Sequence, residues 1–89
     1  MRAIISVVGR DTVGILARVS QACADCNANI VDVTQSVLQG MFVMVMLVDI
    51  TDISVDFPAL NQKLGDLGNE IGMVIHVMHE DIFNSMHRI

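Results

Sequence analysis

The residues with the clearest chemical potential lie in one short loop, Gly9-Arg10-Asp11-Thr12-Val13-Gly14. Glycines let a backbone approach a ligand closely, and the start of a helix offers unpaired N–H groups and a partial positive charge. Such a helix start can hold a carboxylate, while the Asp11 carboxylate can accept hydrogen bonds from an ammonium group. The loop could therefore hold both poles of an amino-acid zwitterion. The alternative is that its glycines only shape the turn and Asp11 only caps the helix.

Other ligand classes fit this loop less well. A phosphate-binding loop carries Lys and Ser or Thr after its last glycine, whereas Ile15 and Leu16 follow Gly14 here. Cys23 and Cys26 have the spacing of a redox or metal pair, but they fall near the end of a predicted helix, where the dipole does not favour a thiolate. We therefore expect these to be core or surface cysteines.

A metal or catalytic site is not predicted elsewhere. One C-x-x-C is half a zinc site, and its partners would have to come from His76, His79 or His87, which have no regular spacing. His76 and His79 should point to opposite faces of a strand, because side chains alternate along it. No nucleophile–base arrangement can be argued from the spacing. We expect a protein that is not an enzyme and has no metal or cofactor.

Composition limits the class of protein. Eighty-nine residues make one domain, and 53% hydrophobic residues with a mean hydropathy of +0.58 are high for a monomer of this size. This excess suggests burial against a partner. The net charge of −5 and the scattered basic residues argue against nucleic acid and anionic membranes as partners.

The same composition suggests a cytoplasmic location. The longest apolar run, residues 41–48, is shorter than the roughly 20 residues of a membrane span, and the N-terminus has no signal-peptide layout. Two cysteines are too few for a disulfide framework, which is typical of a reduced compartment.

The elements around the loop follow from hydrophobic periodicity. Residues 3–8 read as a buried strand, and from Val13 onward apolar residues recur at helical spacing, with Asp11 or Thr12 as N-cap. Strands are expected at residues 30–38 and 41–50, joined by a Gln39-Gly40 hairpin turn. A second helix has Pro58 in its first turn and ends at Gly72. A strand over residues 73–78 and a short helix follow, the latter indicated by Ile82, Phe83, Met86 and Ile89.

This order predicts an α+β, ferredoxin-like βαββαβ sandwich. A four-stranded antiparallel sheet would carry two helices on one face and a short C-terminal helix. We expect residues 1–80 to form the domain and residues 81–89 a helical tail of it. Because the strand over residues 41–50 is apolar on both sides, the tail, a second subunit or both should cover the open face of the sheet.

Residues 7–35, VVGRDTVGILARVSQACADCNANIVDVTQ, resemble the ACT domain. The matching features are a strand, then G-x-D-x-x-G-I-L-A-R-V-S, then a helix, then N-I-x-D at the second strand. The later elements continue the same order, so the resemblance covers nearly the whole chain. With no catalytic domain attached, the chain is similar to the stand-alone single-ACT proteins of bacteria and archaea.

The resemblance implies a homodimer. ACT domains commonly pair side by side and bind effector amino acids at the subunit interface. The first loop of one protomer contributes to this site, here Asp11, Thr12, Val13 and Gly14, and the start of the second strand of the other contributes Asn29 and Ile30. Val13 departs from the family pattern, which frequently has Pro there.

The resulting hypothesis is a non-catalytic allosteric regulator that binds a small ligand, an amino acid by this resemblance, and signals to a partner protein. The first alternative is a ligand-free protein that regulates by protein–protein interaction through its apolar surface. A third hypothesis is a metal-handling protein that uses Cys23, Cys26 and a histidine.

Overall fold

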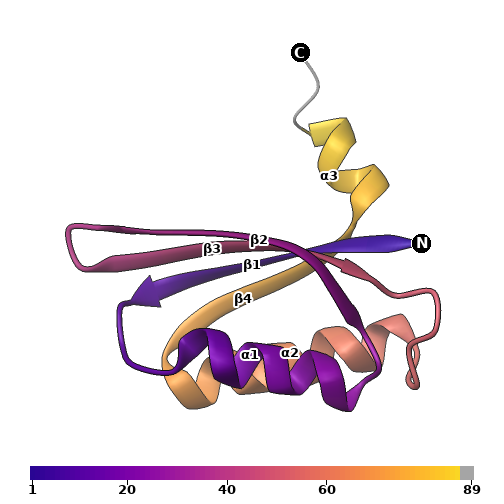
Figure 1. The fold of residues 1–89 in the computed structure, drawn as a ribbon, viewed down its shortest axis with the longest axis horizontal. Helices are drawn as coiled ribbons and strands as arrows, with labels where there is room; N and C mark the ends of the chain where they lie inside the picture. Colours follow the sequence, from indigo (N-terminus) through magenta and orange to yellow (C-terminus); the bar gives the residue numbers. More distant parts are fainter. Residues whose placement is uncertain (87–89) are drawn as a thin grey trace.

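The computed structural model describes residues 1–86 and has the predicted ferredoxin-like fold (Figure 1). The strands form one antiparallel sheet in the order β2-β3-β1-β4, with α1 and α2 on one face. The elements are β1 (Arg2–Arg10), α1 (Ile15–Asp25), β2 (Asn29–Leu38), β3 (Met41–Asp49), α2 (Phe57–Ile71), β4 (Met73–His79) and α3 (Glu80–Met86).

The strand register decides which loops share an end of the sheet. At one end, Arg10 of β1 pairs with Met41 of β3, which also pairs with Leu38 of β2. The β1–α1 loop and the β2–β3 hairpin therefore lie together, at the left of Figure 1. At the other end, Asp49 pairs with both Arg2 and Asn29. The start of β2 is thus at the end of the sheet opposite the β1–α1 loop.

The core fills the space between the sheet and the two long helices. Every second residue of β3 from Phe42 to Val48 is buried, as are Val19 of α1 and Leu64 of α2. The hairpin that aligns β3 has the predicted turn, in which Gln39 and Gly40 both have positive φ (51° and 81°). Two positive φ angles match the right-handed twist of paired strands.

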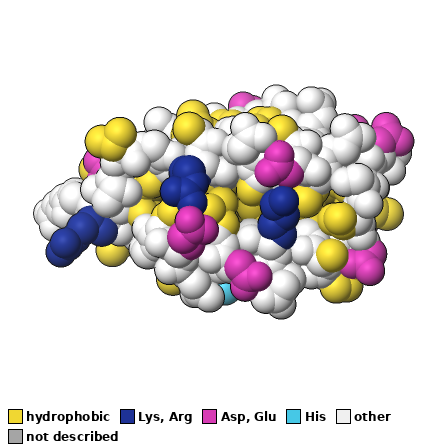
Figure 2. Space-filling view, turned by 90° about the horizontal axis from the view of Figure 1, so that it is seen from below, with side chains coloured by type: hydrophobic (Ala, Val, Ile, Leu, Met, Phe, Trp, Pro, Cys, Tyr) yellow, Lys and Arg dark blue, Asp and Glu magenta, His cyan; other side chains and the backbone are white. Residues whose placement is uncertain are grey.

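The outer surface of the helix layer is charged. Arg18 of α1 and Glu70 of α2 are 2.6 Å apart, and Lys63 and Asp25 are 3.7 Å apart. All four line a groove between the helices. Figure 2 shows this face, where side chains of both charges lie among apolar ones. Exposed pairs of this kind add little stability, so their main effect is to keep this face hydrated.

The ends of α2 follow the sequence signals, whereas the start of α1 does not. The Asp56 carboxylate accepts a hydrogen bond from the Ala59 N–H at 2.8 Å, and Gly72 ends α2 with φ 73°. For α1, the prediction of Asp11 or Thr12 as N-cap is wrong. The N-cap is Gly14, with φ 89° and no side-chain cap. The Asp11 N–H donates to the Gly40 carbonyl at 2.9 Å, which holds Asp11 at the sheet end, short of the helix.

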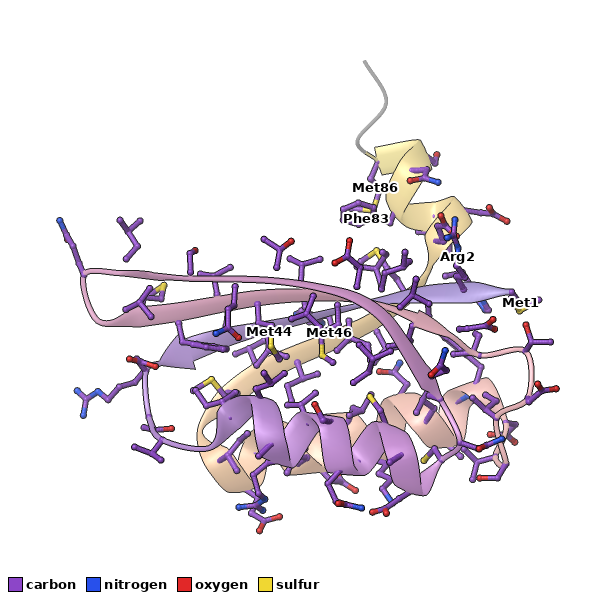
Figure 3. The ribbon with its side chains drawn as sticks, in the orientation of Figure 1. Met1, Arg2, Met44, Met46, Phe83 and Met86 are labelled. Atoms are coloured by element: carbon purple, nitrogen blue, oxygen red, sulfur yellow. The ribbon has the colours of Figure 1, made fainter. Side chains whose placement is uncertain are left out.

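The short helix α3 lies on the sheet face opposite α1 and α2 (Figures 1 and 3). The Arg2 guanidinium donates to both Glu80 carboxylate oxygens at 2.7 and 2.6 Å, which fixes where α3 starts. This helix contacts β1 and β4, so the open face over β2 and β3 is not covered by α3. The predicted contribution of Ile89 lies outside the described residues.

Two glycines of α2 give a matched test of this packing. A Cβ added to Gly68 would lie 2.6 Å from the Met73 carbonyl oxygen, whereas one added to Gly65 would meet nothing within 4 Å. We expect Gly68→Ala to lower the free energy of unfolding by about 1–3 kcal/mol through overpacking. Gly65→Ala should raise it by roughly 0.5–1 kcal/mol, since Ala is the better helix former. Urea unfolding measures both, and equal effects would contradict this packing of α2 against β4.

Candidate functional site

The β1–α1 loop presents its predicted residues to solvent. Asp11, Thr12, Val13 and Gly14 are all exposed, and Val13 is fully so. Since Gly14 provides no side chain, the first N–H groups of α1 have no side-chain cap. Those N–H groups and the nearby Asp11 carboxylate are the two polar features that the sequence predicts here.

The two glycines that bound the loop have different roles. Gly9 lies within β1, and a Cβ there would be 2.8 Å from the Gly72 carbonyl oxygen. Its lack of a side chain is therefore explained by sheet and turn packing alone. Gly14 is surrounded by open space, but its φ of 89° lies in the left-handed region that favours glycine. Only Gly14 stays a candidate for close backbone contact with a ligand.

The other predicted residues lie at the far end of the sheet. Asn29 is exposed and Ile30 half-buried at the start of β2, before a bulge between Ile30 and Asp32. A ten-residue strand spans about 33 Å, so β2 separates Asn29 from the β1–α1 loop by nearly its whole length. One chain therefore does not bring the predicted site residues together.

Apolar side chains are exposed along the edge of the molecule that connects these two ends. α1 packs on the β2 side of the sheet, and β2 is an edge strand. The exposed apolar residues on this side are Val13, Leu16, Val31, Val37 and Leu38. Such a strip beside an unpaired strand is typical of a surface that another chain covers.

The cysteines belong to the core. Cys23 and Cys26 are free thiols with less than 3% of their surface exposed, and burial raises the pKa of Cys23 to about 11. A thiol with a raised pKa is a poor nucleophile and a poor metal ligand at neutral pH. Within residues 1–86, no three His, Cys, Asp or Glu side chains gather as a metal site would require.

The histidines of β4 lie on opposite faces, as predicted. His76 is exposed on the open face, whereas the His79 ring stacks on Phe57 with a centroid separation of 4.1 Å. His87 lies outside the described residues. His76 and His79 therefore cannot converge on one ligand.

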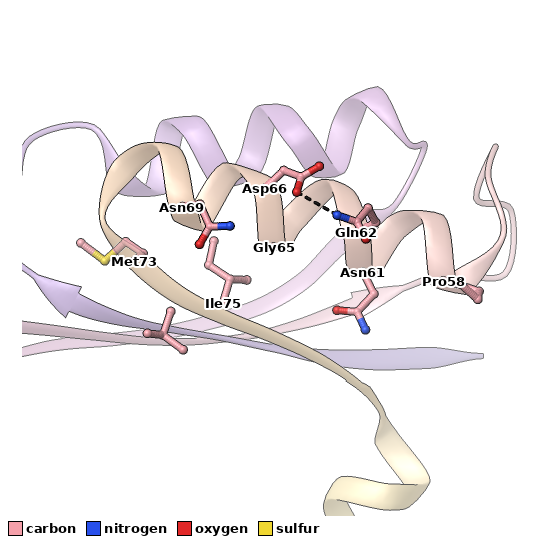
Figure 4. Close-up of a pocket in the computed structure, with 9 residues that line it drawn as sticks. Pro58, Asn61, Gln62, Gly65, Asp66, Asn69, Met73 and Ile75 are labelled. Carbon is pink, nitrogen blue, oxygen red and sulfur yellow. Dashed lines mark hydrogen bonds between the residues drawn. The ribbon is translucent and has the colours of Figure 1, made fainter.

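A groove that the sequence reasoning missed lies between α2 and the edge strand β4 (Figure 4). Its volume is about 440 Å³, and α2 lines it with amide side chains around Gly65. Within it, the Gln62 amide donates to Asp66 at 2.8 Å. None of the predicted site residues lines this groove. The only sequence signal for it was the spacing of Asn61, Gly65 and Asn69 on one face of α2.

The geometry thus defines a βαββαβ domain whose predicted site residues lie at opposite ends of β2, and the comparisons identify its family. The ACT domain model matches residues 2–78, so the chain belongs to the ACT domain family. The UPF0237 protein MJ1558 of Methanocaldococcus jannaschii is 47% identical over 99% of this chain and 98% of its own length. The UPF0237 protein lin0537 of Listeria innocua is 44% identical over the full length of both chains.

A solved structure agrees with this assignment. The ACT domain protein from Streptococcus pneumoniae superposes with a TM-score of 0.82 at 36% identity, covering 93% of each chain. The chain is thus similar to single-domain ACT proteins of both archaea and bacteria. No helix in residues 1–86 has the length and apolar character needed to cross a bilayer.

The buried Cys23 thiol predicts a pH dependence of stability. Its pKa rises from the usual 9.0 to about 11 in the folded chain, so above pH 9 the unfolded chain loses this proton first. The contribution of the thiol to stability is present below pH 9 and is lost as the pH rises toward 11. We expect the free energy of unfolding to fall more steeply between pH 9 and 11 in the native chain than in Cys23→Ala. Equal slopes would contradict the burial of this thiol.

Proposed function

We propose that this chain is a non-catalytic, cytoplasmic regulatory protein that works as a homodimer. It binds a small ligand, an amino acid, at the subunit interface and signals its presence to a partner protein. The observation that carries the proposal is the position of the two half-sites at opposite ends of one edge strand.

Two-fold pairing of β2 with the β2 of a second copy would complete the site. In an antiparallel pair, the start of each strand lies beside the end of the other. Asn29 of one copy would then lie near Leu38 of the other, at the end where the β1–α1 loop lies. Each dimer would contain two sites, and each site would take Asp11 from one copy and Asn29 from the other.

The β2 edge is suited to such pairing. Eight of its ten residues are exposed, and the strand carries no Lys or Pro, which commonly protect an edge from pairing. The exposed Val13 and Leu16 beside it would be buried by the same contact. Removal of this apolar surface from water gives the association its main driving force.

The chemistry of the paired half-sites favours a zwitterion. The uncapped start of α1 attracts a carboxylate, and Asp11 attracts an ammonium group. Asn29 of the other copy offers both donors and acceptors. Charged groups on a ligand would therefore meet opposite charge from one copy and neutral hydrogen-bonding groups from the other.

A route for signalling follows from the loop contacts. The Asp11 N–H is bonded to the Gly40 carbonyl, so a ligand that moves the loop also acts on the β2–β3 turn at the dimer edge. A partner protein that contacts this edge would distinguish the free and bound forms. Allosteric regulation requires that the partner bind one of these two forms more tightly than the other.

A second candidate function is a ligand-free interaction protein. The observation that favours it is the same exposed apolar strip, which could bind a specific enzyme or regulator directly. This alternative predicts that small molecules do not affect the stability of the protein.

Thermal unfolding against the common amino acids, one at a time, separates these two functions. A ligand at about 100 times its Kd stabilises by roughly 2.7 kcal/mol, which raises the Tm of so small a domain by several degrees. We expect one amino acid, or a close chemical relative, to give this shift, and Asp11→Ala and Asn29→Ala each to abolish it. Asp52→Ala, which removes an exposed carboxylate from another loop, is the matched control and should retain the shift.

Two results would contradict the proposal. No shift with any amino acid would favour the ligand-free alternative. A shift that survives both Asp11→Ala and Asn29→Ala would place the ligand elsewhere, and the groove between α2 and β4 would be the next region to test by substitution.

A further inference from the structure

The open face of the sheet is largely apolar, with Ser6 of β1 paired with His76 of β4 near its middle. Residues that alternate with the buried positions of β1, β3 and β4 point away from α1 and α2. The apolar ones, which we call the open-face cluster, are Ile4, Val8, Val43, Val45, Leu47, Val74 and Met78. No charged residue lies among them.

Polar and charged side chains surround this cluster. Arg2, with its partner Glu80, lies at one end of the sheet, and Arg10 lies at the other. Asp32 and Thr34 follow the β2 edge, and His76 follows the β4 edge. Apart from Ser6, the side chains in the middle of this face are apolar and those at its borders are polar, which is the arrangement of a protein–protein interface. The helix layer on the opposite face has ion pairs across its apolar groove instead.

The size of the open face suits a protein partner. Four strands spaced about 4.8 Å apart and about 30 Å long project an area of roughly 570 Å². The accessible surface of protruding side chains exceeds this projection, and α3 adds to it. The projection alone is roughly 70% of the ~800 Å² that each partner of a stable interface contributes.

The helix α3 rises from one end of the open face, where it contacts β1 and β4 (Figure 1). Phe83 and Met86 lie on the side of α3 above the sheet (Figure 3), and Met86 and Ile82 are 65% and 52% exposed. On the sheet itself, a hollow of about 140 Å³ lies between Ile4, Asp32 and Val45. A second sheet stacked at the usual ~10 Å would cover this hollow and contact the apolar side of α3.

We infer that the open face binds the open face of a second copy of this chain, so that two sheets stack with their α3 helices at the sides. A second copy fits because an identical face is equally rich in apolar residues and has no charged residue within its open-face cluster to desolvate. This stacking is independent of the β2 edge. If the side-by-side dimer of the proposed function also forms, its two open faces lie on the same side, and stacking two dimers closes a tetramer with D2 symmetry.

The mass of the full chain in solution tests the stacking. Sedimentation of the native chain, at several concentrations, should give four times the 9.7 kDa chain mass. Val45→Asp places a charge in the open-face cluster and should halve this mass. Val55→Asp, in the loop before α2, is the matched control and should leave it unchanged. Should Val45→Asp fail to fold by circular dichroism, Val74→Lys replaces it, because Val74 is already 59% exposed.

A β2-edge variant separates this inference from the proposed function. Val37→Asp should also halve the mass if both interfaces exist. A native mass of two chains that falls to one with Val45→Asp but not with Val37→Asp would support stacking and contradict side-by-side pairing. A native monomer, or a mass that neither Val45→Asp nor Val74→Lys changes, would overturn the stacking inference whatever Val37→Asp does.

Discussion

The antiparallel pairing of β1 with both β3 and β4 sets the position of every other part of the molecule. Through β3 it also fixes β2, which is left as an unpaired edge of ten residues. The same register places the β1–α1 loop beside the β2–β3 hairpin and sends Asn29 to the other end. A site that uses both regions cannot form within one chain, because the sheet holds them about 30 Å apart. The proposed site, which uses both regions, would therefore need a second copy of the chain.

The distribution of apolar surface is consistent with this need. A chain of this size with 53% hydrophobic residues cannot bury them all in one core. Those in excess gather on the β2 edge and the open face, while ion pairs cross the helix layer. Apolar residues therefore concentrate where the sheet could gain a neighbour or a second layer.

Much of the fold could be predicted because its signals are local. Gln39-Gly40, Pro58 and Gly72 each favour a particular backbone conformation, and the structure has those conformations. The start of α1 was predicted wrongly because the bond from the Asp11 N–H to the Gly40 carbonyl joins residues distant in the sequence. The groove along Gly65 was missed for a similar reason, since it depends on how α2 packs beside β4.

The candidate site could be predicted only in part. The loop residues were indicated by their types and spacing, but the sequence alone says nothing of their distance from Asn29. That distance comes from the register of β2 on β3. The resemblance to ACT domains implies a shared site, and the strand register is a physical reason why such a site would need two copies.

Mixing two inactive variants tests the shared site most directly. Asp11→Ala and Asn29→Ala each remove a group from both sites of their own homodimer, but a mixed dimer keeps one intact site. After the two variants are unfolded and refolded together, calorimetric titration with the amino acid found by thermal screening should recover about a quarter of the native binding capacity, with native affinity. Recovery of no binding from the mixture, with both variants folded and dimeric, would contradict a site built from two copies.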